Sequence, residues 1–96
     1  MNKGAPLVRD IRSGYNERKI QILAALEAEQ GLGSLEILAR IRAISSRDVS
    51  VRSVQMALMR YHKQRLLVRR GRRGDYLYEL SEKGKRRLEW LRSLTE

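Results

Sequence analysis

The apolar residues of this chain change their spacing after Leu66, and this change constrains the fold more than any other feature of the sequence. Up to that point apolar residues recur three or four positions apart, which is typical of amphipathic helices. Beyond it, Leu67–Arg70 and Tyr76–Leu80 alternate as strands do, and the glycines of the intervening Gly71–Asp75 favour a tight turn. A chain of 96 residues suits one domain with one core. We therefore predict a mainly α-helical α+β domain that contains one small hairpin.

The first helix is expected to begin at Asn16, a residue type that caps helices, and to end at Gly31–Gly33. Residues 1–15 hold two glycines and a proline among scattered apolar residues, so we interpret them as an N-terminal arm that is partly ordered. The domain itself is then predicted to span residues 16–96.

Two further helices have serine caps in the sequence. Ser34 is expected to cap the second helix, with Glu36 in its first turn. The expected buried stripe of that helix consists of Leu35, Leu38, Ala39 and Ile41. Ser81 is expected to cap the last helix, where leucines recur at three-residue spacing.

The third helix carries the clearest signals. Ser50 is expected to be its N-cap, with Val49 and Val54 packed together across the first turn. At about 100° per residue, the face predicted to be buried holds Val54, Ala57, Leu58 and Tyr61. The opposite face holds Arg52, Met56, Met59 and Lys63, flanked by Gln55 and Arg60. Two roles remain open for the methionines: filling gaps against a neighbour, or contact with thymine methyl groups and sugars.

The charge of the chain points to a polyanionic partner. The formal net charge is +10, and residues 1–48 carry 8 basic and 6 acidic side chains against 13 and 5 in residues 49–96. No acidic residue occurs between Arg52 and Gly74. A surface that serves solubility alone usually mixes both signs. We therefore expect this interval to bind phosphate groups.

Composition also excludes several classes of function. The chain has no Cys and one His, which excludes disulfides, thiolate chemistry, sulfur-ligated zinc and multi-histidine metal sites. The apolar runs are too short for a membrane span, and no secretion signal opens the sequence. We expect a cytoplasmic protein without cofactor or catalytic residues. His62 is expected to be a surface or partly packed residue, and Asp75, Glu79 and Glu82 to be solvated rather than a nuclease metal cluster.

The segments Val49–Leu58, Gln64–Arg69 and Tyr78–Gly84 resemble the winged helix-turn-helix family, in particular its small PadR-like and MarR-like regulators of archaea and bacteria. The first two segments resemble the recognition helix and the first wing strand. The third resembles the strand-to-helix turn Tyr-x-Leu-Thr-x-x-Gly, with Ser81 in place of Thr. Together the likeness covers about residues 17–92. Arg65 departs from the family, which usually has a Gly with positive φ there, so we expect mild strain or a different helix end.

The resemblance implies sequence-specific binding of double-stranded DNA by a homodimeric transcriptional regulator located at the nucleoid. A recognition helix at about 50–65 would enter the major groove, and a wing at about 69–76 would lie on the adjacent minor groove or backbone. Arg52 and Gln55 are expected to contact bases. The predicted DNA-binding residues are Ser50, Arg52, Ser53, Gln55, Met56, Met59, Arg60, Lys63, Arg69, Arg70, Arg72 and Arg73. The predicted dimer surface is Leu88, Trp90, Leu91 and Leu94. The alternative is that this stripe closes the core of its own chain, a role that Leu88 in particular would suit.

Two other functions fit the same sequence. A partition-type or architectural adaptor of the same fold would spread along DNA in many copies and recruit a protein partner. An RNA-binding protein would use the same basic residues on a structured RNA. We predict the transcriptional regulator and keep these two functions as alternatives.

Overall fold

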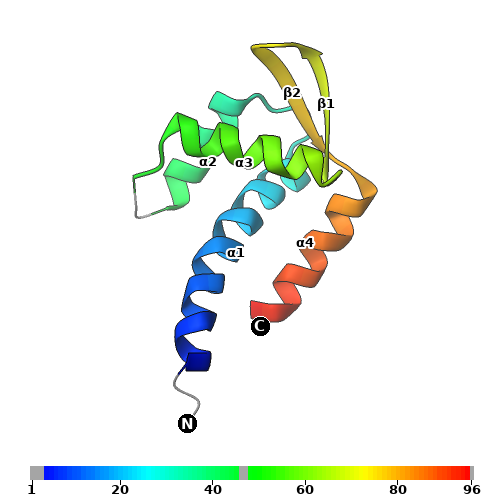
Figure 1. The fold of residues 1–96 in the computed structure, drawn as a ribbon. Coiled ribbons are helices and arrows are strands. Elements are labelled where there is room, and N and C mark those ends of the chain that lie inside the picture. Colours follow the sequence, from blue (N-terminus) through cyan, green and yellow to red (C-terminus); the bar gives the residue numbers. More distant parts are fainter. Residues whose placement is uncertain (1–3, 46–47, 96) are drawn as a thin grey trace.

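A computed structural model describes residues 4–45 and 48–95, and the side chains of residues 16–45 and 48–94. Four helices and a two-stranded antiparallel sheet follow one another as α1 (Gly4–Ala28), α2 (Ser34–Ile44), α3 (Val51–Lys63), β1 (Leu67–Arg72), β2 (Asp75–Leu80) and α4 (Glu82–Thr95) (Figure 1). This confirms the predicted mainly helical α+β domain with one small hairpin.

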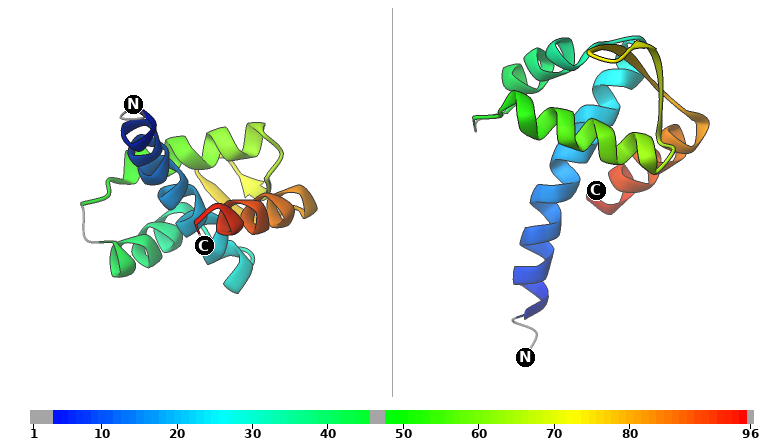
Figure 2. Two further views of the ribbon diagram at one scale, coloured as in Figure 1. Left: turned by 90° about the horizontal axis from the view of Figure 1, so that it is seen from below. Right: turned by 45° about the horizontal axis from the view of Figure 1, so that its top comes forward.

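Helix α1 is longer than the sequence predicted. It begins at Gly4 and continues past Asn16 without a break, so the expected start at Asn16 is wrong and helix covers most of the segment interpreted as an arm. Pro6 lies in the first turn, where a proline removes no helical hydrogen bond. The N-terminal part of α1 projects beyond the rest of the chain (Figure 2).

Helix α2 differs from the prediction in its cap and in its buried face. The N-cap is Gly33 rather than Ser34, because the backbone N–H of Gly33 donates to Oε1 of Glu36 at 2.9 Å. The buried residues are Ile37, Leu38 and Ile41, whereas Leu35 and Ala39 are exposed. The stripe is therefore rotated from the one expected.

Helix α3 follows the prediction closely. Ser50 is the N-cap, and its Oγ accepts a hydrogen bond from the backbone N–H of Ser53 at 3.0 Å. Val49 is buried, as is the whole predicted inner face, formed by Val54, Ala57, Leu58 and Tyr61. These side chains hold one side of α3 in the core, so its other side faces outward.

The hairpin is attached to the helical body by the connection between α1 and α2. β1 and β2 are longer than expected and pair from Leu67 with Leu80 to Arg72 with Asp75. Leu32 and Tyr78 form an isolated antiparallel bridge, in which the Tyr78 N–H donates to the Leu32 carbonyl at 2.8 Å. This bridge fixes the hairpin beside α2 and α3.

Helix α4 closes the core against α1 and β2. Ser81 caps it as predicted, since its Oγ accepts from the backbone N–H of Gly84 at 2.9 Å. Leu88 and Leu91 are 0% and 2% exposed. Both leucines pack into the core of their own chain. This is the alternative expected for Leu88, and it corrects the prediction that Leu91 lies on a dimer surface.

Within residues 4–45 and 48–95, no helix combines the length and apolar character that crossing a membrane requires.

Candidate nucleic-acid interface

The outer face of α3 is a row of exposed side chains. Arg52, Met56, Met59 and Lys63 all lie on it, and the two methionines are 45% and 47% exposed. They are exposed because the opposite face of the same helix supplies four buried core residues. The gap-filling role is therefore not supported within a single chain, and the methionines present apolar surface between two cations.

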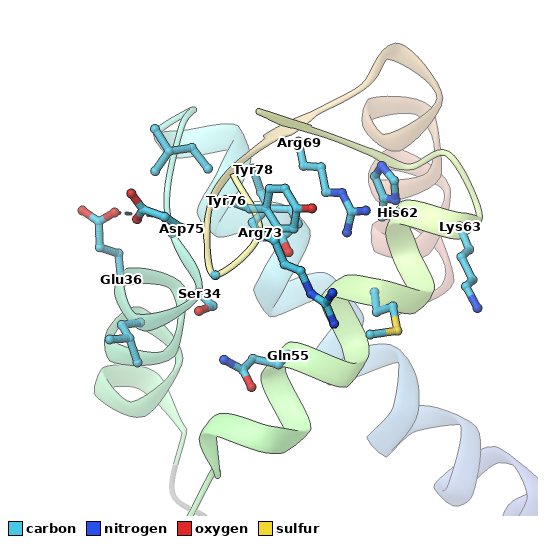
Figure 3. A pocket seen from close by; sticks show the side chains of 15 residues that line it. Ser34, Glu36, Gln55, His62, Lys63, Arg69, Arg73, Asp75, Tyr76 and Tyr78 are labelled. Carbon is cyan, nitrogen blue, oxygen red and sulfur yellow. Dashed lines mark hydrogen bonds between the residues drawn. The ribbon is translucent and has the colours of Figure 1, made fainter. Parts of the chain in front are cut away.

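A groove of about 760 Å³ lies between the hairpin and one edge of this face, where Gln55, Met59, His62 and Lys63 line it. Arg52 and Met56 are not among its lining residues. Figure 3 shows side chains from α3, β1, β2 and the start of α2 around it. Of the predicted site residues, the groove brings together Gln55, Met59, Lys63, Arg69 and Arg73. Its two acidic lining residues, Glu36 and Asp75, lie together across from the α3 side chains (Figure 3).

The arginines of β1 divide between two faces of the hairpin. Arg69 faces α3, and its guanidinium carbon lies 4.2 Å from the centre of the Tyr76 ring. Arg70 is the next residue and therefore points to the opposite face, where its Nε lies 3.5 Å from Oε2 of Glu79. Arg72 shares the face of Arg70 and does not line the groove. The predicted site residues thus do not form one surface.

The remaining predicted residues lie at or beyond the edge of the groove. The Ser53 hydroxyl donates to the Ser50 carbonyl at 3.0 Å, so both serines take part in the helix cap. The guanidinium carbon of Arg60 lies 5.8 Å from the centre of the Tyr61 ring. Neither serine nor Arg60 lines the groove.

His62 lines the groove as well, although it was not predicted as a site residue. It is partly buried at the end of α3 and lines the groove beside Arg69 (Figure 3). Burial, and secondly the nearby Arg69 guanidinium, lower the pKa of His62 below its usual value. A single histidine has no spacing partner in the sequence, so only the fold shows that it faces the hairpin.

One cation, that of Lys19, is buried inside the described part of the domain. The Lys19 side chain is 4% exposed, and its ammonium donates to Oε1 of Gln64 at 3.0 Å and lies 5.0 Å from the centre of the Tyr61 ring. Burial, followed by the charges of Arg87 and Arg60, lowers the pKa of Lys19. No local pattern marks this lysine as buried, since its neighbours on α1 are ordinary helix formers.

In the described part of the chain, no three His, Asp or Glu side chains gather closely enough to hold a metal ion. Comparisons with protein-family models, with curated proteins and with solved structures find no match to this chain.

Proposed function

We propose that the chain is a winged helix protein that binds double-stranded DNA sequence-specifically as a homodimeric transcriptional regulator. Helix α3 enters the major groove, and the hairpin lies on the adjacent minor groove or backbone. The order of three helices, a hairpin and a last helix supports this fold. The resemblance of Tyr78–Gly84 to the family's strand-to-helix turn adds support, because Ser81 and Gly84 make the contacts that such a turn needs.

The observation that carries the proposal is the placement of an exposed, cationic helix face beside a basic hairpin. An α-helix fits the major groove of B-DNA, and its outward side chains then meet base edges. The outer face of α3 is not used by the core of its own chain, and Arg73 at the hairpin turn lines the same groove as Gln55 and Lys63. A duplex backbone that passes between α3 and the hairpin would meet cations on both sides.

The side chains divide into those that read bases and those that contact the backbone. Arg52 and Gln55 lie in the first turns of α3, where recognition helices contact bases. Arginine suits guanine and glutamine suits adenine, while Met56 and Met59 offer apolar contact to thymine methyl groups. Lys63, Arg69 and Arg73 are assigned to phosphates. Replacing Arg52 by Ala is therefore expected to relax base preference without abolishing binding.

The neighbours Arg69 and Arg70 provide a matched test. Both are arginines of β1, but Arg69 faces α3 and Arg70 pairs with Glu79 on the other face. Arg69→Ala is expected to raise the Kd for every duplex about tenfold and to reduce the slope of log Kd against log salt by about one. Arg70→Ala should change Kd by less than about twofold, since an exposed ion pair contributes little.

Fluorescence anisotropy with labelled duplexes at several salt concentrations measures both effects. If about six phosphates are neutralised per protomer, the wild-type log affinity should fall with log salt at a slope near −5. A wild-type protein that binds no duplex even at low salt would rule the proposal out. Equal losses for the two variants would contradict the assigned orientation of the hairpin.

A footprint on genomic fragments, including the region upstream of the protein's own coding sequence, separates a regulator from a spreading adaptor. A regulator protects one symmetric site of fixed length, because a dimer contacts two half-sites about one helical turn apart. Protection that lengthens with protein concentration would favour the adaptor. Competition between duplex DNA and structured RNA at equal salt tests the RNA-binding alternative in the same preparation.

A further inference from the structure

The corner where α3 ends and β1 begins gathers three cationic or titratable side chains. His62, Lys63 and Arg69 line the groove between α3 and the hairpin. The same three residues also line a second, smaller hollow together with Arg65, Leu67 and Val68. They therefore form the wall between two surface depressions, and no lining residue of the smaller one is acidic.

The contacts at this corner leave its cations available to a ligand. Among the described residues, no ion pair joins His62, Lys63 or Arg69 to a carboxylate. Arg69 is instead held over the ring of Tyr76, 4.2 Å from its centre. A cation–π contact uses no hydrogen bond of the guanidinium, so the N–H groups of Arg69 can still donate to an anion. The imidazole of His62 lies beside that guanidinium (Figure 3).

We propose that this corner binds one phosphodiester group of the duplex between the imidazole of His62 and the guanidinium of Arg69, and that the complex takes up a proton on His62. The inference rests on the proposed DNA binding and adds to it a phosphate site and a dependence on pH. An imidazolium donates a charge-assisted hydrogen bond to a phosphate oxygen. Neutral imidazole donates from a given ring nitrogen in only one of its two tautomers, and that hydrogen bond carries no charge assistance.

The charged groups around His62 determine in which direction the affinity for DNA changes with pH. Lys63 on α3, Arg65 in the connection, Arg69 on β1 and Arg73 at the turn are cationic, and Tyr76 and Tyr78 on β2 are neutral. The acidic residues of the groove are Glu36 and Asp75, which lie away from His62 (Figure 3). In the free protein, burial and Arg69 lower the pKa of His62. A bound phosphate adds a negative charge next to both groups and so raises the pKa of the imidazole.

Because the bound form then holds the proton more tightly than the free form, affinity for DNA rises as pH falls between the two pKa values. Each unit by which the bound pKa exceeds the free pKa corresponds to about a tenfold tighter complex at low pH than at high pH. Below the pKa of His62 in the free protein, and above its pKa in the complex, His62 is expected to cause no further change in affinity with pH.

The single histidine of the chain makes the test direct. The imidazole proton resonance of His62 is followed by NMR from about pH 5 to pH 8, for the free protein and for its complex with a duplex of about 20 base pairs. The pKa of His62 is expected to be higher in the complex. In parallel, Kd is measured at about pH 5.5 and pH 8 for wild type, His62→Gln and Lys63→Gln.

Wild type and Lys63→Gln should both bind more tightly at the lower pH, with Lys63→Gln weaker than wild type at both values. His62→Gln should bind with nearly the same Kd at both. Circular dichroism establishes that each variant is folded. A duplex that binds while leaving the pKa of His62 unchanged would overturn this inference and leave the proposed function intact. Failure of every protein to bind duplex at either pH would reject the proposed function itself.

Discussion

The hydroxyl of Ser81 donates a hydrogen bond of 2.7 Å to the carbonyl oxygen of Arg65, which ties the start of α4 to the connection between α3 and β1. The same hydroxyl accepts from the Gly84 N–H, and the Ser81 N–H donates to the Leu66 carbonyl at 3.0 Å. Ser81 thus caps its own helix and anchors the segment that leads into the hairpin. The backbone of Arg65 has φ of 64°, a left-handed conformation that non-glycine residues seldom adopt.

Replacing Arg65 by Gly is expected to stabilise the fold by about 0.5–1 kcal/mol. The left-handed region costs a non-glycine residue about 1–2 kcal/mol, and the greater freedom of glycine in the unfolded chain offsets part of that gain. Urea unfolding measures the change. Arg65→Ala is the matched control, because it removes the same charge and keeps the backbone cost. A gain in Arg65→Ala as large as that in Arg65→Gly would assign the effect to charge repulsion instead.

Gly84 is required by a close approach between α4 and the connection before β1. A Cβ at this position would lie 2.2 Å from the Leu66 carbonyl oxygen and 2.9 Å from Cδ1 of Leu80. Gly84→Ala is therefore expected to lower the free energy of unfolding by about 3 kcal/mol, despite the better helix propensity of alanine. Thermal and urea unfolding measure the loss.

Gly31→Ala is a suitable comparison for that variant. Gly31 has φ of 80°, and a Cβ there would meet nothing within 4 Å. Gly31→Ala should lower the free energy of unfolding by only about 1–2 kcal/mol, which is the cost of a left-handed backbone conformation for a non-glycine residue. If the two alanine variants lose the same amount of stability, the contact between Gly84 and Leu66 is not as tight as the structure has it.

The elements that the sequence predicted well are those defined by local signals. The cap of α3 at Ser50 and its buried face depend only on residues within that helix, and both are confirmed. The positive φ of Arg65 was one of two outcomes expected from its departure from the family pattern. The two strands followed from alternation and flanking glycines, although each proved longer than expected.

The features that the sequence did not predict depend on how elements pack. Gly14 lowers helix propensity close to Asn16, yet α1 continues through it and begins at Gly4, so the local signal for an arm was misleading. Leu91 belongs to a stripe that suits either its own core or a partner, and only the packing of α4 on α1 decides between them. Likewise, alternation separates Arg69 from Arg70, but the face that meets α3 is set by the tertiary structure.

The buried Lys19 is expected to make the stability of the fold depend on pH. Its pKa is lowered in the folded protein, so between that pKa and 10.5 the unfolded state binds more protons than the folded state. The free energy of unfolding therefore receives a contribution from Lys19 that rises with pH through this window. Urea unfolding of wild type and of Lys19→Met at several alkaline pH values gives the difference between their free energies of unfolding. The wild type should gain stability relative to Lys19→Met as pH rises.

Gln64→Glu is the matched variant for this effect. The Gln64 side chain already accepts from the Lys19 ammonium at 3.0 Å, so a carboxylate there provides an opposite charge next to the buried lysine. This variant should remove the rise in stability with pH. The difference in free energy of unfolding between wild type and Lys19→Met could instead stay constant across the alkaline range. Lys19 would then have the same proton affinity in the folded and unfolded states.

The exposed side of α4 provides the test of the proposed homodimer. Trp90 and Leu94 are 56% and 54% exposed, while Leu88 and Leu91 on the other side of the helix are buried. In a two-fold symmetric dimer, a contact through Trp90 and Leu94 would use each residue twice. An aromatic residue buried in such an interface commonly contributes roughly 2 kcal/mol or more to the free energy of association. Trp90→Ser with Leu94→Ser is therefore expected to raise the dimer dissociation constant at least about 100-fold, measured by sedimentation equilibrium.

Leu35→Ser with Ile44→Ser on α2 is the control, because these residues are at least as exposed, at 65% and 68%, and lie outside α4. Since Trp90 is the single tryptophan, its emission should also shift to the red when the wild-type dimer is diluted. A wild-type protein that stays monomeric at all concentrations, or a dimer lost only in the α2 variant, would contradict this interface.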